Sequence, residues 1–144
     1  MTNRKIKGAT SKSFNNIQFK SQLEVTVYKT LLQAGFEPSY EHYKFIIWEG
    51  FKPEKILFYN KDNKTKMLKL ENTKIRDITY TPDFIFKHKD ILIIIEAKGF
   101  ENDIFPVKKK LFRKVLEEHY PNSIYFEIFT KKQLLQAINI IKAL

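Results

Sequence analysis

The fold is decided by the stretch Ile91-Leu92-Ile93-Ile94-Ile95-Glu96-Ala97-Lys98-Gly99. Its aliphatic run does not alternate with polar residues, which is typical of a strand that is buried on both faces of a sheet. The stretch 78–86 before it is also rich in β-branched and aromatic residues, and the polar segment 87–90 links the two. The pattern therefore predicts an antiparallel pair of strands, with the strand 91–97 at the centre of the sheet.

Three helices are predicted around this pair. Apolar residues recur at helical spacing over 21–34, where Gly35 supplies a stop signal, and again from Pro106 to a point before Pro121. Thr130 and Gln133 form a capping box at the start of the last helix. Further strands are predicted at 40–48, 56–59, 65–70 and 124–129. This order of elements predicts an α/β (α+β) fold, a mixed β-sheet flanked by helices, with a β-hairpin insertion around 51–76.

Length and composition limit the class of protein. The chain has 144 residues and a formal charge of +10, and it contains no cysteine, which excludes disulfides, thiolate zinc sites and a cysteine nucleophile. We expect a flexible basic arm over 1–16 and a single domain over 17–144. The longest strongly apolar run is far shorter than the ~20 residues of a membrane span, and the first residues lack the apolar core of a secretory signal. We therefore expect a cytoplasmic protein whose partner is a polyanion, most commonly nucleic acid inside a cell.

Polar groups at the end of the central strand form the candidate site. Alternation places Glu96 and Lys98 on one face of the strand, and Asp83 can approach the same place from the neighbouring strand. Two carboxylates that converge beside an ammonium group favour a divalent cation with oxygen ligands. Asp83 and Glu96 would hold Mg²⁺, with the backbone carbonyl of Ala97 as a further ligand, and Lys98 would supply the fixed cation that phosphodiester hydrolysis requires. The alternative for so short a motif is a solvated ion pair at a strand end.

These residues resemble the motif of the PD-(D/E)XK nuclease superfamily. Thr81-Pro82-Asp83-Phe84 and Glu96-Ala97-Lys98-Gly99 carry the likeness, with Phe19-x-Ser21-x-x-Glu24 at the start of the first helix. Within the superfamily the chain looks most like small phage nucleases, including the endonuclease I type of Holliday-junction resolving enzyme. The resemblance spans residues 19–130 and implies a restriction-endonuclease-like core.

The resemblance also implies roles for individual residues. Glu24, Asp83 and Glu96 would be the acidic metal-site residues, and Lys98 the catalytic lysine. Ser21-x-x-Glu24 is equally a capping box, in which the carboxylate accepts a backbone hydrogen bond, so both roles stay open for Glu24. Endonuclease I enzymes carry an acid shortly before the first strand, where this chain has Ser39, with Glu41 nearby. That departure leaves the second metal position open.

Basic residues provide candidate contacts to a phosphate backbone. They lie in the expected arm and on the polar side of the second helix, and the segment 52–76 could form a second basic surface. A solvated charged face is the alternative for any one of them. The candidate DNA-binding residues are Arg4, Lys5, Lys7, Lys12, Lys20, Lys108, Lys109, Lys110, Arg113 and Lys114.

Together these features predict a Mg²⁺-dependent endodeoxyribonuclease, with Mn²⁺ as a substitute metal. The resemblance implies a homodimer that cuts branched DNA, as a Holliday-junction resolvase does in DNA recombination; a phage-encoded protein would act in the host cytoplasm. Three alternatives remain: a nuclease of the same fold that acts on linear duplex, flaps or ends, a non-catalytic DNA-binding protein of the same fold, and an RNA-binding structural protein.

Overall fold

The computed structural model describes residues 12–99 and 104–144 and is built around a four-stranded mixed sheet. The strand order is β10 (Ser123–Ile128), β9 (Ile91–Ala97), β8 (Phe84–His88) and β3 (Ser39–Tyr40). Strand β9 runs antiparallel to β8 and parallel to β10, and β3 runs antiparallel to β8. The predicted α+β class and the antiparallel pair are confirmed, and β9 occupies the central position expected of it.

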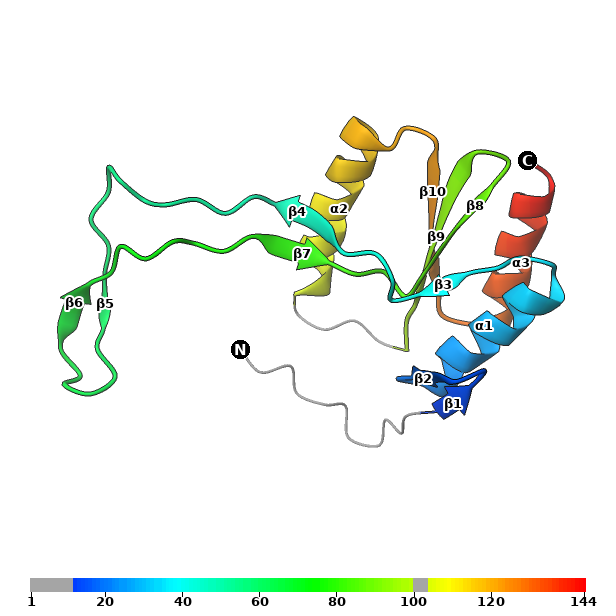
Figure 1. The fold of residues 1–144 in the computed structure, drawn as a ribbon, viewed down its shortest axis with the longest axis horizontal. Helices are drawn as coiled ribbons and strands as arrows, with labels where there is room; N and C mark the ends of the chain where they lie inside the picture. The colour runs from blue at the N-terminus through cyan, green and yellow to red at the C-terminus, as the bar shows by residue number, and fades with distance from the viewer. Residues whose placement is uncertain (1–11, 100–103) are drawn as a thin grey trace.

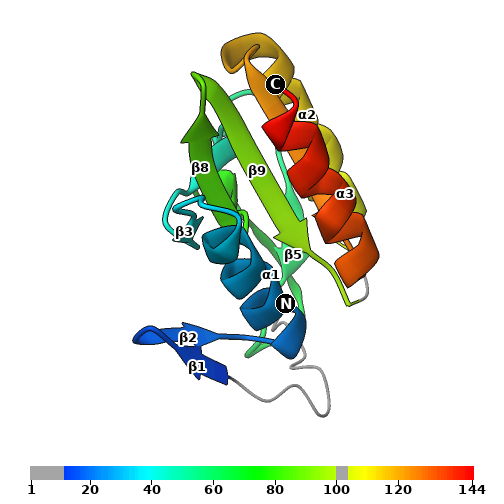
Figure 2. The same ribbon diagram turned by 90° about the vertical axis from the view of Figure 1, so that its right-hand side faces the viewer.

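The helices cover both faces of this sheet. Helices α1 (Gln22–Gln33) and α3 (Lys131–Lys142) lie on one face, and α2 (Phe105–His119) lies on the other (Figure 2). Alternate residues of β9 enter two cores: Ile93 and Ile95 pack with α1 and α3, whereas Ile94 packs with α2. This division explains why the run is apolar without interruption. None of the described helices combines the length and the apolar character that a bilayer span requires.

Both predicted capping boxes are present. Ser21 caps α1 with Glu24 as the reciprocal partner, and Thr130 caps α3 with Gln133. The observed helix bounds agree with the predicted ones because such caps satisfy the free N–H groups of the first turn at defined residues. The cap of α1 also fixes the place of Glu24 beside the end of the sheet.

Two predicted strands are each divided in the structure. The segment 40–48 forms β3 and β4 (Phe45–Trp48), and 78–86 forms β7 (Ile78–Tyr80) and β8. Pro82 has no N–H to donate to a ladder, and Glu41 has a left-handed backbone with φ of 45°. Strands β4 and β7 pair with each other outside the main sheet. The two breaks lie side by side, since the Glu41 N–H donates to the Asp83 carbonyl oxygen at 2.8 Å.

The predicted hairpin insertion is a long arm that projects from the body (Figure 1). At its tip β5 (Tyr59–Lys61) pairs antiparallel with β6 (Leu68–Leu70), so the hairpin is confirmed. Both strands are shorter than 56–59 and 65–70 suggested: β5 lies nearer the turn than predicted, and β6 begins farther from it. The turn is stabilised by Asp62, whose Oδ1 accepts hydrogen bonds from two backbone N–H groups. At the base of the arm Phe51 and Ile75 form an antiparallel bridge.

The expectation of a flexible arm over 1–16 is wrong for its last five residues. Strand β1 (Lys12–Phe14) pairs antiparallel with β2 (Ile17–Phe19). Asn15 and Asn16 both have positive φ, of 50° and 62°, and asparagine adopts this conformation more easily than most residues. The polar pair is thus a two-residue hairpin turn rather than part of a tail. Residues 1–11, with the candidate DNA contacts Arg4, Lys5 and Lys7, lie outside the described residues.

Candidate metal centre

Four carboxylates lie in register across one end of the main sheet. Glu127 of β10 is the register partner of Glu96 of β9. The β8–β9 ladder pairs Phe84 with Ile95, so Asp83 stands opposite Glu96, and the β3–β8 ladder in turn places Asp83 opposite Glu41. The sheet therefore brings together side chains that are up to 86 positions apart in sequence, as the numbers of Glu41 and Glu127 show.

Asp83 is one of the two buried members of this row, with Glu96 beside it. Its Oδ2 accepts a hydrogen bond of 2.8 Å from the Ala97 N–H, which fixes the carboxylate against β9. Burial raises the pKa of Asp83 well above its usual range, and the nearby carboxylates of Glu96 and Glu24 raise it further. A positive charge near Asp83 would offset the repulsion among these carboxylates.

Glu96 is buried next to Asp83, and its carboxylate accepts hydrogen bonds from a tyrosine hydroxyl and a backbone N–H. Its Oε2 accepts hydrogen bonds from the Tyr80 hydroxyl at 2.7 Å and from the Asp83 N–H at 3.1 Å. The Tyr80 hydroxyl also lies 2.9 Å from that of Tyr125. Burial raises the pKa of Glu96, although the Tyr80 hydrogen bond and the charge of Lys98 act in the opposite direction. Tyr80 and Tyr125 were not identified from the sequence, because the Tyr80 contact crosses from β7 to β9.

Lys98 lies where the sequence predicted, on the same face as Glu96. Its Nζ is 3.3 Å from Glu96 Oε1, and 12% of the side chain is exposed. The ammonium group also lies 3.4 Å from the centroid of the Phe105 ring at the start of α2. A largely buried lysine that is held from two sides has little rotamer freedom, so its charge is fixed in place relative to Glu96.

Glu24 makes the capping contacts and also reaches the carboxylate row. Its Oε2 accepts hydrogen bonds from the backbone N–H groups of Lys20 at 2.7 Å and of Ser21 at 2.9 Å. The Tyr40 hydroxyl lies 3.4 Å from both carboxylate oxygens. A hydrogen bond with Glu24 is among the causes that raise the pKa of Asp83. The two roles that the sequence left open for Glu24 are therefore compatible in one geometry.

Three acidic side chains come close enough to share one cation. Glu24, Glu41 and Asp83 each offer an oxygen, and these atoms all lie within 4.8 Å of one another. Carboxylate oxygens are the ligands that Mg²⁺ and Ca²⁺ prefer, and the carboxylates of Glu96 and Glu24 add to the effect of burial in raising the pKa of Asp83, so the residues fit a hard divalent cation. Glu96 is outside this group of three among the described residues, which differs from the ligand set expected from the sequence.

Glu41 is the member of the group that the motif did not identify. Its placement depends on the left-handed backbone and on the pairing of β3 with β8, and the prediction of one continuous strand over 40–48 concealed both. Its carboxylate forms an ion pair with Lys20. Burial lowers the pKa of Lys20, but the hydrogen bond and charge of Glu41, with Asp83 and Glu24, raise it overall. Lys20 therefore neutralises part of the acidic group and is not simply a free phosphate contact.

Ala97 and the candidate DNA-binding residues occupy more varied positions. Ala97 ends β9, and its N–H rather than its carbonyl oxygen contacts Asp83. Lys12 is exposed on β1, and Lys110, Arg113 and Lys114 are exposed along α2, whereas Lys108 is half-buried. Lys114 forms a surface ion pair with Glu118 at 3.9 Å.

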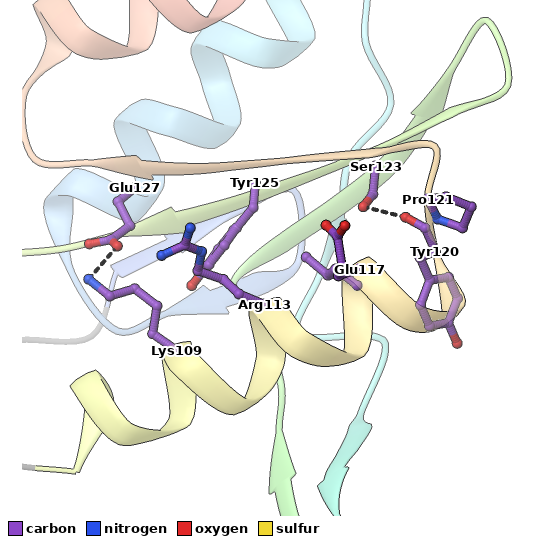
Figure 3. Close-up of a pocket in the computed structure, with 9 residues that line it drawn as sticks. Lys109, Arg113, Glu117, Tyr120, Pro121, Ser123, Tyr125 and Glu127 are labelled. Atoms are coloured by element: carbon purple, nitrogen blue, oxygen red, sulfur yellow. Dashed lines mark hydrogen bonds and ion pairs between the residues drawn. The ribbon is translucent and has the colours of Figure 1, made fainter.

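A pocket of about 440 Å³ lies between α2 and β10 (Figure 3). Lys109 points into it and forms an ion pair of 2.6 Å with Glu127, while Arg113 lies beside Tyr125. The pocket therefore has mixed charge, because Glu117 and Glu127 line it together with Lys109 and Arg113. Tyr125 connects its floor to the Tyr80–Glu96 hydrogen bonds.

Comparison of the chain with family models, curated proteins and solved structures gives no match. A function must therefore be argued from the positions and chemistry of the residues described above.

Proposed function

We propose that the protein is a metal-dependent endodeoxyribonuclease that hydrolyses phosphodiester bonds in branched DNA. One observation carries this proposal. A three-carboxylate group, Glu24, Glu41 and Asp83, adjoins a buried Lys98–Glu96 pair at the same end of the sheet. A cation site next to a fixed ammonium group is the equipment that hydrolysis of a phosphodiester needs.

The surroundings of each residue at the site indicate a separate role for it in the proposed reaction. Glu24, Glu41 and Asp83 would hold the cation, which when bound polarises a phosphoryl oxygen and lowers the pKa of water. Lys98 is placed to orient the attacking water and to stabilise negative charge that develops on the phosphate. Glu96 has a raised pKa and a donor on each oxygen, so it can hold or receive a proton beside Lys98.

The substrate class follows from charge. A chain with a net charge of +10 and exposed basic residues along α2 favours a phosphate backbone. Branched DNA, a homodimer that makes paired cuts, and a cytoplasmic location come from the resemblance to endonuclease I enzymes and are part of the proposal.

The substrate is tested with a labelled four-way junction and a linear duplex of matched sequence, each incubated with the protein in Mg²⁺ or in EDTA. We expect cleavage of the junction in Mg²⁺ and none in EDTA. Equal cleavage of both substrates would replace the resolvase assignment with a general nuclease, and binding without cleavage would leave a DNA-binding protein. Mn²⁺ in place of Mg²⁺ should support the same cuts.

The roles of Glu96 and Lys98 are tested in the same assay. Glu96→Gln and Lys98→Ala should each lower the cleavage rate by about a hundredfold or more while the fold is retained. The matched control is Glu127→Gln, which changes the register partner of Glu96 but leaves the proposed machinery intact. Full activity in either site variant would show that the reaction occurs elsewhere.

A further inference from the structure

The projecting arm exposes large apolar side chains that its own chain does not cover. Their exposed fractions run from 47% to 75%, although they stand together on one hairpin and the segment leading into it. Ordinary monomers leave such residues scattered singly over the surface rather than gathered. The residues are Ile56, Leu57, Phe58, Tyr59, Met67, Leu68 and Leu70.

The strand register sorts these side chains into faces. Tyr59 is opposite Leu70, and Lys61 is opposite Leu68, so these four side chains share one face of the hairpin. Leu57 precedes Tyr59 by two residues and continues that face. Asn60 and Lys69 form the next pair and point to the other side. By the same alternation Phe58 and Met67 lie on the side of Asn60 and Lys69, so both faces carry exposed apolar side chains. The face with Leu57, Tyr59, Leu68 and Leu70 is the more apolar one and is called the apolar face below.

This face offers part of the area that a stable interface needs. A large apolar or aromatic side chain presents roughly 200 Å², so the four on this face, which are half to three-quarters exposed, leave on the order of 500 Å². A stable protein–protein interface buries about 800 Å² on each partner. Reciprocal docking would bury both this face and a receiving surface on each subunit, so the two together approach that area.

The body carries an apolar pocket that is open to receive such a face. It has a volume of about 530 Å³ and is lined by Tyr43, Phe45, Ile85, Leu92 and Tyr120, with Lys87 at its exposed rim. It lies at the end of β8 and β9 away from Asp83 and Glu96, because Leu92 is the second residue of β9 and Lys87 is the last but one of β8. The pocket is separate from the candidate metal centre.

We propose that the apolar face of the arm docks into this pocket on a second copy of the chain, and that the exchange is reciprocal. Two complementary surfaces on one molecule close into a symmetric pair when each arm reaches its partner's body. Packing of arm against arm is disfavoured, because 52–76 carries eight basic residues against three acidic ones. The inference names the interface of a dimer and does not rest on the proposed nuclease activity.

The first test is the oligomeric state of the full chain, measured by sedimentation over a range of concentrations. Wild type should be a dimer, and Leu57→Ser with Leu68→Ser should raise its dissociation constant by at least about a hundredfold, since two buried leucines are lost from the interface. Both residues are about three-quarters exposed, so the fold of the body is unaffected. Lys64→Ser at the turn is the matched control and should stay dimeric. A monomeric wild type, or a dimeric double variant, overturns the proposal.

The second test identifies the contact itself. The chain contains no cysteine, so single cysteines can be placed without background. Lys61→Cys lies on the apolar face of the arm and Lys87→Cys on the rim of the pocket. Mixing the two variants, one with a size tag, should give cross-links between arm and pocket. Cross-links of Lys61→Cys only to itself would indicate arm-on-arm packing and overturn the proposal. A monomer whose DNA affinity falls in the Leu57→Ser and Leu68→Ser variant would make the arm a DNA contact instead, which also overturns it.

Discussion

Asp83 illustrates how a single buried carboxyl group couples the site to solution conditions. Its pKa is raised in the folded protein by burial and by the carboxylates of Glu96 and Glu24, while in the unfolded chain it is near 4. The folded state therefore keeps a proton that the unfolded chain has lost. The contribution of this proton to folding stability is complete below the pKa that Asp83 has in the unfolded chain. It is lost as the pH rises through the pKa that Asp83 has in the folded protein.

The first prediction concerns Asp83→Asn, which keeps the shape but removes the charge. In EDTA the variant should become more stable than wild type as the pH rises, by ~1.4 kcal/mol for each unit by which folding raises the Asp83 pKa. Mg²⁺ should raise the melting temperature of wild type, and more at pH 8 than at pH 5, but should leave the variant unchanged. Thermal unfolding at several pH values, with and without Mg²⁺, measures both effects. A constant difference between the two proteins across pH would contradict the assignment.

At the scale of residues, the sequence predicted the positions of those side chains that are set by the single hairpin of β8 and β9. Asp83, Glu96 and Lys98 were placed correctly because alternation along β9 and its pairing with β8 are local patterns. Glu41 could not be placed, since it needs both a left-handed φ and a contact with a strand more than forty residues away.

At the scale of elements, helix α1 joins a structural cap to the site. Glu24 Oε2 accepts the capping hydrogen bonds, and the same carboxylate offers an oxygen to the group with Glu41 and Asp83. Glutamine can take the same capping position because its carbonyl oxygen accepts the same N–H groups. The two functions can therefore be separated by the choice of substitution.

The second prediction uses this difference. Glu24→Gln should keep the stability of wild type in EDTA but lose most Mg²⁺-dependent stabilisation and activity. Glu24→Ala should lose these and also about 1 kcal/mol of unfolding free energy, as Ser21→Ala should through the other half of the box. Denaturant unfolding and Mg²⁺ titration measure the two properties. Unchanged Mg²⁺ binding in Glu24→Gln would restrict Glu24 to the cap.

The third prediction concerns the base of the arm, where Gly50 meets the opposite chain segment closely. A Cβ atom on residue 50 would lie 2.1 Å from the carbonyl oxygen of Ile75, which is backbone and cannot rotate away. Gly50→Ala should therefore part the two sides of the arm, make 51–76 more sensitive to limited proteolysis and weaken the proposed dimer. Gly99→Ala is the control, because a Cβ there meets nothing within 4 Å. Unchanged proteolysis would mean that the arm tolerates the shift.

Elements were predictable where local signals fixed their ends. The caps at Ser21 and Thr130 and the apolar run of β9 gave helix and strand bounds close to those observed. The hairpin β1–β2 and the division of two predicted strands were missed. Their turns depend on positive φ at Asn15, Asn16 and Glu41, which residue type alone does not show.

At the scale of the whole molecule, charge is distributed unevenly. The chain has a net charge of +10, yet four carboxylates cross one end of the sheet, and lysines accompany three of them. Exposed basic residues such as Lys110 and Arg113 lie on α2, on the opposite face of the sheet from α3 (Figure 2). The exposed basic residues would attract a phosphate backbone, while the carboxylates at the end of the sheet would attract a cation.

The fourth prediction tests which face meets DNA. Lys110→Gln with Arg113→Gln should weaken DNA binding and lower the slope of log affinity against log salt by about 2, close to one unit for each lost phosphate contact. Lys131→Gln with Lys132→Gln on α3 removes the same charge from the other face and should leave the slope unchanged. Fluorescence anisotropy over a salt series measures it. Equal effects of both pairs would mean that attraction is general rather than directed by α2.

The central claim is that Glu24, Glu41 and Asp83 hold the cation with which this protein cuts DNA. The most direct measurement is the rate of junction cleavage as a function of Mg²⁺ concentration for wild type, Glu41→Gln and Glu127→Gln. The account predicts no cleavage without Mg²⁺, a much higher Mg²⁺ requirement or no activity for Glu41→Gln, and a wild-type curve for Glu127→Gln. An uncut junction with wild type at saturating Mg²⁺, or a wild-type curve for Glu41→Gln, would contradict it.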